Sequence, residues 1–161
     1  MTVVGQTEAI IPAPPDVVFA ALTDVTRLPE WNARMTRVVE PAVALAPGAA
    51  WVVEFRVLGR TWQSRSTLEE LHPGARRFVH RSCTDDGNPS YTRWEWTVAE
   101  DPVGSRVRVA WSLHPLTFWR RTLFVRMRAR QLAHSELPAS LLALSRMLQQ
   151  QGSAAVDGPS A

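Results

Sequence analysis

The chain has 161 residues, 45% of them hydrophobic and 20% charged, which is the size and composition of one globular domain with a substantial core. Seven Trp and five Phe residues supply large apolar side chains, so a disordered or fibrous chain is excluded. All 18 basic residues are arginine and the net charge is only +3, so no nucleic-acid partner is indicated. The exclusive use of arginine, with many Ala, Pro and Val residues, is typical of a GC-rich genome such as an actinobacterial one.

The longest apolar runs, such as 42–46 and 141–144, are far shorter than the roughly 20 residues that a membrane-spanning helix needs. No positively charged segment followed by an apolar stretch of signal-peptide length precedes Pro12, so we expect a cytoplasmic protein. Cys83 is the single cysteine, which excludes an intramolecular disulfide and a cysteine-based zinc site. The sequence has no glycine-rich phosphate loop, zinc-protease motif or nucleophile elbow, and we therefore expect neither a metal nor a cofactor.

The first predicted element is a strand over residues 2–11, which ends at the proline-rich segment 12–15. Proline suits the first turn of a helix, where the backbone N–H groups have no helical partner, so a helix is predicted from this segment to Thr23. Asp24 can then cap a second short helix over residues 25–31.

From residue 34 to 115, apolar and polar residues alternate with the period of a β-strand. The predicted strands include 51–57, 62–68, 78–83, 94–98 and 107–113. Short segments rich in Gly, Pro, Asp and Asn separate them, and the first two form a predicted hairpin. The pattern therefore predicts an antiparallel meander with one apolar face.

The last predicted element is a long amphipathic helix from about Thr117 to Gln151. At 100° per residue its apolar stripe comprises Leu116, Trp119, Leu123, Met127, Leu137, Leu141 and Leu148, whereas Arg121, Val125 and Arg128 lie on the opposite face. Pro138 removes one backbone hydrogen bond, so a kink or a short break is expected there. Residues 152–161 show no pattern and are expected to form a disordered tail, which leaves 1–151 as a single domain.

Two stretches resemble a known family. They are "IPAPPDVVFAALTDVTRLPEWN" at 11–32, and "GSRVRVAW" at 104–111 with the later helical "SLLALSRML" at 140–148. They are similar to the START-like superfamily, also called SRPBCC, and within it to the polyketide cyclase/dehydrase and lipid-transport group. The resemblance implies an α+β helix-grip fold, in which a curved antiparallel sheet of about seven strands wraps around a long C-terminal helix and two short helices follow the first strand. It also implies a ligand cavity between the sheet and the long helix.

The alternation of the strands and the stripe of the helix predict which side chains line that cavity. The aromatic and apolar candidates are Trp31, Trp51, Phe55, Trp62, Phe78, Trp94, Trp96, Trp111, Trp119, Leu123 and Met127. These side chains either fill the core completely or surround a flat, hydrophobic ligand.

Arg130 and His134 interrupt the apolar stripe of the predicted helix. Spaced i,i+4, they could present a cation and a proton donor to one ligand carbonyl, as an enolising cyclase requires. Alternatively, Arg130 extends to the cavity mouth. His80 shares the inward face of its strand with Phe78 and is a third catalytic candidate, although a structural role is the alternative.

Three functions remain open at this point. The chain is a binding protein for an aromatic or polyketide-like molecule, a polyketide cyclase/dehydratase or aromatase, or a self-resistance protein that sequesters an enediyne-type antibiotic. Five arginines between 120 and 130 form either a solvated helix face or a docking surface for an acidic acyl-carrier protein. The oligomeric state is left open.

Overall fold

The computed structural model describes residues 2–32, 34–57, 59–117 and 125–156. Their elements in chain order are β1 (Val3–Ile11), α1 (Pro15–Thr23), a 3-10 turn (Val25–Arg27), α2 (Leu28–Trp31), β2 (Met35–Glu40), β3 (Ala50–Val57), β4 (Arg60–His72), a second 3-10 turn (Pro73–Ala75), β5 (Arg77–Thr84), β6 (Tyr91–Asp101), β7 (Gly104–His114), α3 (Val125–Gln131), a π-helical turn (Leu132–Glu136) and α4 (Leu137–Val156). Among these described helices, none combines the length and the apolar character that a membrane span requires.

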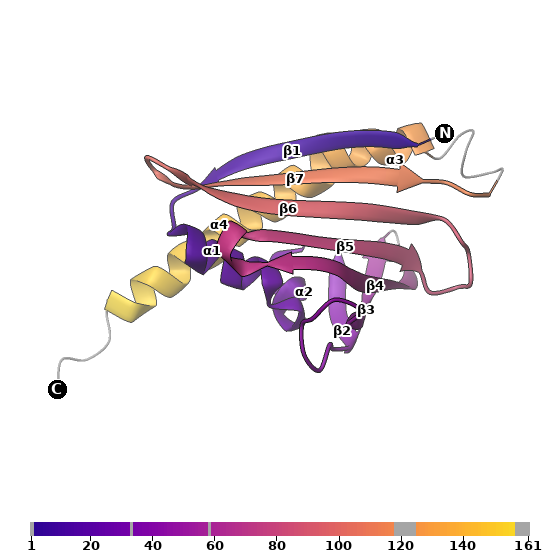
Figure 1. Cartoon of the computed structure of the whole chain (residues 1–161), viewed down its shortest axis with the longest axis horizontal. Helices are drawn as coiled ribbons and strands as arrows, with labels where there is room; N and C mark the ends of the chain where they lie inside the picture. Colours follow the sequence, from indigo (N-terminus) through magenta and orange to yellow (C-terminus); the bar gives the residue numbers. More distant parts are fainter. Residues whose placement is uncertain (1, 33, 58, 118–124, 157–161) are drawn as a thin grey trace.

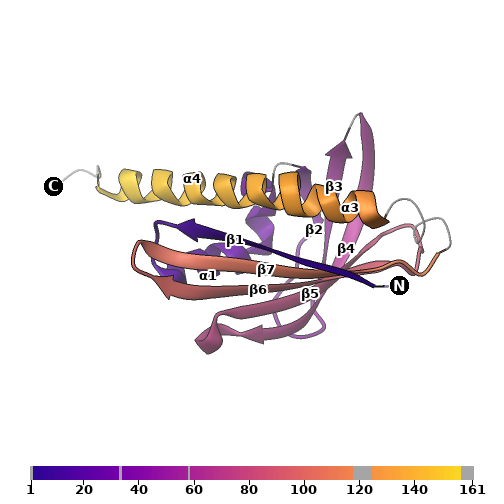
Figure 2. The same cartoon turned by 90° about the horizontal axis from the view of Figure 1, so that it is seen from above.

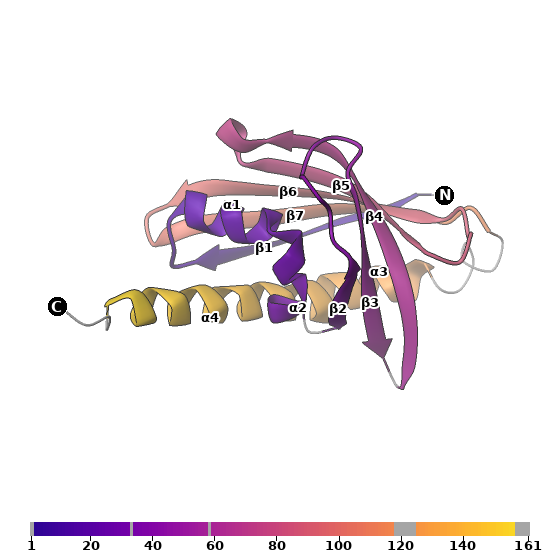
Figure 3. The same ribbon diagram turned by 90° about the horizontal axis from the view of Figure 1, so that it is seen from below.

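The described strands form one antiparallel sheet in the order β1-β7-β6-β5-β4-β3-β2. The sheet curves, and the long helix built from α3 and α4 runs along its concave side (Figures 1 and 2). The short helices α1 and α2 lie on that same side, near one end of the sheet (Figure 3). The α+β helix-grip fold predicted from the sequence is confirmed.

The N-terminal segment folds as its capping residues predict. Helix α1 begins with proline in its first turn, and the Asp24 side chain accepts a hydrogen bond from the Thr26 backbone N–H at 3.2 Å. This bond caps the 3-10 turn that leads into α2. The chain is thereby directed back over the sheet, and α2 packs against α4.

Edge strand β1 contains a glycine that the packing requires. Gly5 pairs with Trp111 of β7, and a β-carbon at Gly5 would overlap the Trp111 ring. The Trp111 side chain therefore lies flat across its neighbouring strand and is buried in the core.

Strand β4 contains a β-bulge, because Leu68 pairs with His80 whereas Glu70 pairs with Val79. The extra residue is Glu69, and both Glu69 and Glu70 contact arginines on the face of the sheet opposite the long helix. The bulge changes the phase of the alternation, and it bends the strand. Hence Leu71 and not Glu70 packs against the core after it.

The long helix differs from its prediction in the phase of its buried face. A π-helical turn precedes Pro138, and in it the Leu137 N–H bonds to the Leu132 carbonyl. Such a turn accommodates one additional residue, so the helix before it is rotated by about 100° relative to a uniform α-helix. The buried residues are Val125, Leu132, Glu136, Leu137, Ser140, Leu141, Leu144 and Leu148.

This rotation overturns the prediction that Arg130 and His134 face the sheet, because both side chains are exposed. Ala129 and Ala133 pack against the core in their place. Met127 is 60% exposed, and Val125, predicted to lie on the opposite face, is buried. The helix also continues to Val156, beyond the predicted end at Gln151.

Candidate functional site

A cavity of about 710 Å³ lies between the concave face of the sheet and the long helix. Strands β3 to β6, helix α2 and the segment from Val125 to Ser140 supply its walls. The predicted aromatic residues that line it are Trp31, Trp51, Phe55, Trp62, Phe78, Trp94 and Trp96. Met127 and Trp62 line it while being 60% and 40% exposed, so the cavity opens to solvent beside them.

The other predicted cavity residues have different positions. Trp111 is buried in the core but does not line the cavity, because its ring covers Gly5 of β1. Arg130 and His134 are exposed on the outer side of the helix and do not line the cavity. Trp119 and Leu123 lie outside the described residues.

The rings on the sheet form a continuous aromatic wall. Trp51 stacks on Phe78 with centroids 6.1 Å apart, and His80 lies 5.3 Å from Trp51 and 6.2 Å from Trp94. Since alternate residues of neighbouring strands point to the same face, three strands deliver these rings to one surface. The wall can therefore stack against a flat aromatic ligand.

His80 is the polar residue of this aromatic wall. Burial among the rings lowers its pKa to about 3, so the imidazole is neutral near pH 7. Its Nδ1 has no hydrogen-bond partner among the described residues, and neither has the Nε1 of Trp31, which also lines the cavity. Buried polar atoms without partners are rare, and they cost stability.

The hydroxyl groups of the wall are largely engaged within the fold. Ser64 donates to the Cys83 carbonyl at 3.0 Å, and Ser82 accepts from Trp94 Nε1 at 2.8 Å. Ser90 accepts from the Leu116 backbone N–H at 2.9 Å. These bonds hold neighbouring side chains in place, and among the described cavity residues His80 Nδ1 and Trp31 Nε1 are the buried side-chain atoms without a partner.

The opposite wall carries a charged cluster of Arg34, Arg128, Gln131 and Glu136, which we call the arginine cluster. Glu136 is buried and forms ion pairs with both arginines, at 3.3 Å to Arg34 Nη1 and 3.0 Å from Oε1 to Arg128 Nη2. Gln131 contacts Arg34 when its amide oxygen faces the guanidinium. The cluster ties the loop before β2 to the long helix.

The prediction of cavity residues did not include this cluster. Uniform helical phase placed Arg128 on the outer side, whereas the π turn brings Glu136 inward and Arg128 reaches back to it. One signal was present in the sequence, because Glu136 is the single acidic residue between Pro102 and Val156. Of the five arginines between 120 and 130, Arg128 lines the cavity and Arg126 and Arg130 are exposed, whereas Arg120 and Arg121 lie outside the described residues.

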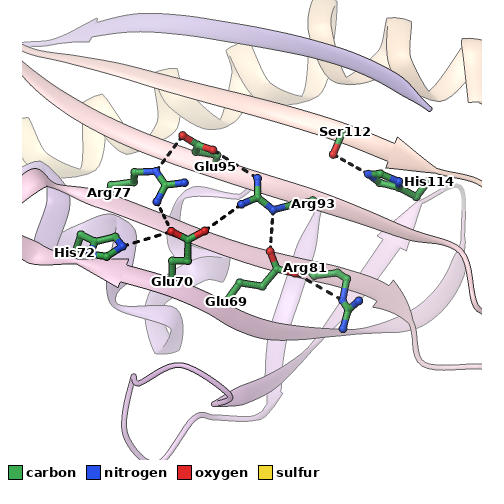
Figure 4. Close-up of polar contacts among 9 residues, drawn as sticks. All are labelled: Glu69, Glu70, His72, Arg77, Arg81, Arg93, Glu95, Ser112 and His114. Carbon is green, nitrogen blue, oxygen red and sulfur yellow. Dashed lines mark hydrogen bonds and ion pairs between the residues drawn. The ribbon is translucent and has the colours of Figure 1, made fainter.

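A second aromatic group lines the cavity at the ends of β6 and β7. Tyr91 stacks on His114 with centroids 4.4 Å apart, and Arg81 lies over the Tyr91 ring at 5.1 Å. His114 Nε2 lies 2.9 Å from the Ser112 hydroxyl (Figure 4).

Within the described part of the chain, no three His, Cys, Asp or Glu side chains gather as metal ligands would.

Solved structures with the same fold support this architecture. The aromatase/cyclase Zhui from Streptomyces sp. R1128 superposes with a TM-score of 0.75 and 17% identity, over 96% of this chain and 98% of that one. The crystal structure of Ara h 8.0201 has a TM-score of 0.72 and 14% identity, over 93% of this chain and 99% of that one. The di-domain ARO/CYC StfQ from the steffimycin biosynthetic pathway has a TM-score of 0.73 and 14% identity, over 94% of this chain and 52% of that one.

Among curated proteins, none matches this sequence significantly. The family model for polyketide cyclase / dehydrase and lipid transport matches residues 2–144, which include the N-terminal motif, the whole sheet and most of the long helix. The chain therefore belongs to the polyketide cyclase / dehydrase and lipid transport family, as the motif at 11–32 and the helix-grip fold both indicate.

Proposed function

We propose that the chain binds a hydrophobic, aromatic small molecule of polyketide type inside the cavity. The observation that carries this proposal is the aromatic wall of stacked rings that lines one side of the cavity. A polycyclic ligand can stack on these rings, which a saturated lipid chain cannot do. The cavity volume of about 710 Å³ suits a ligand of several fused rings.

The second candidate function is that of a polyketide cyclase or aromatase. It is favoured by one cavity holding both a neutral imidazole and guanidinium groups. Guanidinium groups stabilise an enolate oxygen as its negative charge develops, and a neutral imidazole can relay a proton. Arg34, Arg128 and His80 would carry these roles, because Arg130 and His134 do not line the cavity.

The two candidates differ in the fate of the ligand. A binding protein returns its polycyclic ligand unchanged, whether the purpose is transport or sequestration. A cyclase converts a linear poly-β-ketone precursor into a ring with loss of water. Incubation with such a precursor, followed by mass spectrometry of the released compound, distinguishes the two candidates. A compound that has lost one water molecule is lighter than the precursor by about 18 mass units, which indicates a cyclase.

Binding itself is tested with a neutral probe, anthracene-2-carboxamide. We expect it to quench the Trp fluorescence of the cavity and to form a one-to-one complex in native mass spectrometry. Ser66 is buried and lines the cavity, so Ser66→Phe should fill the space and abolish quenching. Thr97→Phe is the matched control, because Thr97 pairs with Arg77 and Arg108 and does not line the cavity.

Circular dichroism of both variants establishes that the fold is retained. Quenching that survives in Ser66→Phe would place the probe outside the cavity and contradict the proposal. Absence of a complex with the wild-type protein would contradict it as well.

A further inference from the structure

We propose that the ligand of this cavity carries a carboxylate, which the arginine cluster binds at the wall opposite the aromatic rings. This inference rests on the proposed function and narrows it to aromatic acids. The charged side chains among the described residues that line the cavity are Arg34, Arg128 and Glu136, two cations and one anion. The cavity therefore has an excess of one positive charge.

The geometry of the cluster leaves donors free. Each guanidinium has five N–H groups, whereas the Glu136 carboxylate has about four acceptor sites and serves both arginines. The side chains of Arg34 and Arg128 remain 27% and 39% accessible, whereas that of Glu136 is 7% accessible. The unsatisfied N–H groups therefore face the accessible space, and the carboxylate that partly neutralises them does not.

The outer face of the sheet provides an internal reference for this charge ratio. Arg77 contacts Glu70 and Glu95, and Arg93 contacts Glu69, Glu70 and Glu95. With Arg81, which contacts Glu69, three arginines there share three carboxylates, whereas in the cavity two arginines share one. One further carboxylate would bring the cavity to the balance that the outer face already has.

The chemistry of the cluster favours a carboxylate over other anions. Planar guanidinium groups bind the two oxygens of a carboxylate with two parallel hydrogen bonds, and such charge-assisted bonds are about twice as strong as neutral ones. A partly enclosed, apolar cavity strengthens them further because it screens charges less than water does. The ligand that fits both walls is therefore an aromatic polycycle with a carboxylate on its edge.

A matched pair of probes tests this inference. Anthracene-2-carboxylate and anthracene-2-carboxamide share one ring system and differ in charge. By Trp-fluorescence titration at low ionic strength, we expect the wild-type protein to bind the carboxylate at least about tenfold more tightly, as one charge-assisted hydrogen bond provides. The preference should decrease as salt is added.

Variants of the cluster then locate the effect. Arg34→Gln and Arg128→Gln should each reduce the preference for the carboxylate over the carboxamide to about threefold or less, whereas Arg34→Lys should retain part of this preference. Glu136→Gln removes the competing carboxylate and should increase the preference. Arg108→Gln is the control, because it removes the same positive charge at a position outside the cavity. Arg108 is exposed, bonds to Gln6 and does not line this cavity.

The outcomes separate the inference from the proposed function. Equal affinity of the wild-type protein for the two probes overturns the carboxylate inference and leaves the cavity as a binding site for neutral aromatic ligands. Binding of neither probe overturns the proposed function. A preference for the carboxylate that persists in both Arg→Gln variants, or that disappears in Arg108→Gln, also overturns the inference. The comparison of the two probes on the wild-type protein requires no variant to fold.

Discussion

The two faces of the sheet use the same alternation of residues in opposite ways. On the face turned away from the long helix, arginines and glutamates of β4, β5 and β6 form a network in which each group contacts a partner of opposite charge (Figure 4). Arg77 there holds the pKa values of Glu70 and Glu95 below their usual range through its hydrogen bonds. On the concave face, rings of the same three strands enclose a cavity in which His80 and Trp31 have unpartnered polar atoms.

The proposed function assigns the ligand to the concave face. On the outer face, the mutually neutralised charges act on the sheet itself. On the concave face, the unpartnered buried atoms cost stability, and the aromatic rings offer a surface on which a second molecule can stack. The three experiments below test this contrast, beginning with the change expected to have the largest effect.

Trp51→Ala should reduce the free energy of unfolding by about 3–5 kcal/mol, because the residue is 2% exposed and its removal leaves a void in the aromatic wall. Trp62→Ala, at the 40% exposed mouth, is the matched control and should cost about 1 kcal/mol or less. Urea unfolding monitored by circular dichroism measures both. Similar losses for the two variants would mean that the aromatic wall is not the stabilising part of this face.

His80 should make stability depend on pH between 6.5, its ordinary pKa, and about 3, its folded pKa. Its folded pKa is about 3, below the ordinary value of 6.5, so the unfolded chain binds a proton first as the pH falls. The stability that neutral His80 allows is therefore present above pH 6.5 and decreases below it, by at most about 2 kcal/mol between pH 7 and pH 5. Urea unfolding of the wild type and of His80→Phe at these two pH values measures the difference.

The remaining histidines are present in both proteins, so they cancel in this comparison. The carboxylates of the outer face, whose pKa values are lowered on folding, are also present in both proteins, so their contribution cancels as well. An identical pH dependence in the two proteins would show that His80 is not buried as a neutral group.

Arg93→Gln, on the outer face, should have the smallest effect, about 1 kcal/mol or less. Its partners are each about one-third exposed, and each retains a second arginine: Arg81 for Glu69, and Arg77 for Glu70 and Glu95. Thermal unfolding of this variant beside Trp51→Ala tests the ranking of the two faces. A loss as large as that of Trp51→Ala would indicate that the network, and not the aromatic wall, dominates the stability of the sheet.

Sequence patterns predicted the sheet well and the helix poorly, for a physical reason. In a strand the side chain of each residue points to the face opposite that of its neighbour, so Trp51, Phe78 and Trp94 could be placed on one face from their local sequence. The β-bulge at Glu69 changed this phase only at the end of β4. In the helix, by contrast, one π turn changed the phase for all residues before it.

That phase change turns two of the three catalytic candidates away from the cavity. Uniform α-helical geometry predicts that Arg130 and His134 point toward the sheet, whereas the structure exposes both. Strand alternation predicts that His80 points toward the cavity, and His80 does line it. A residue predicted from a period of two is thus less sensitive to a distant irregularity than one predicted over several helical turns.

By itself, the sequence determined the family, the order of the elements and the face of each strand that carries aromatic rings, because these depend on short motifs and on the local alternation of residues. Only the tertiary structure decided which helical residues face the cavity and that Arg34, Arg128 and Glu136 meet there. The position of the π turn depends on which backbone groups pair beside Pro138 once the helix packs on the sheet. The ion cluster joins segments about a hundred residues apart, which no local pattern can bring together.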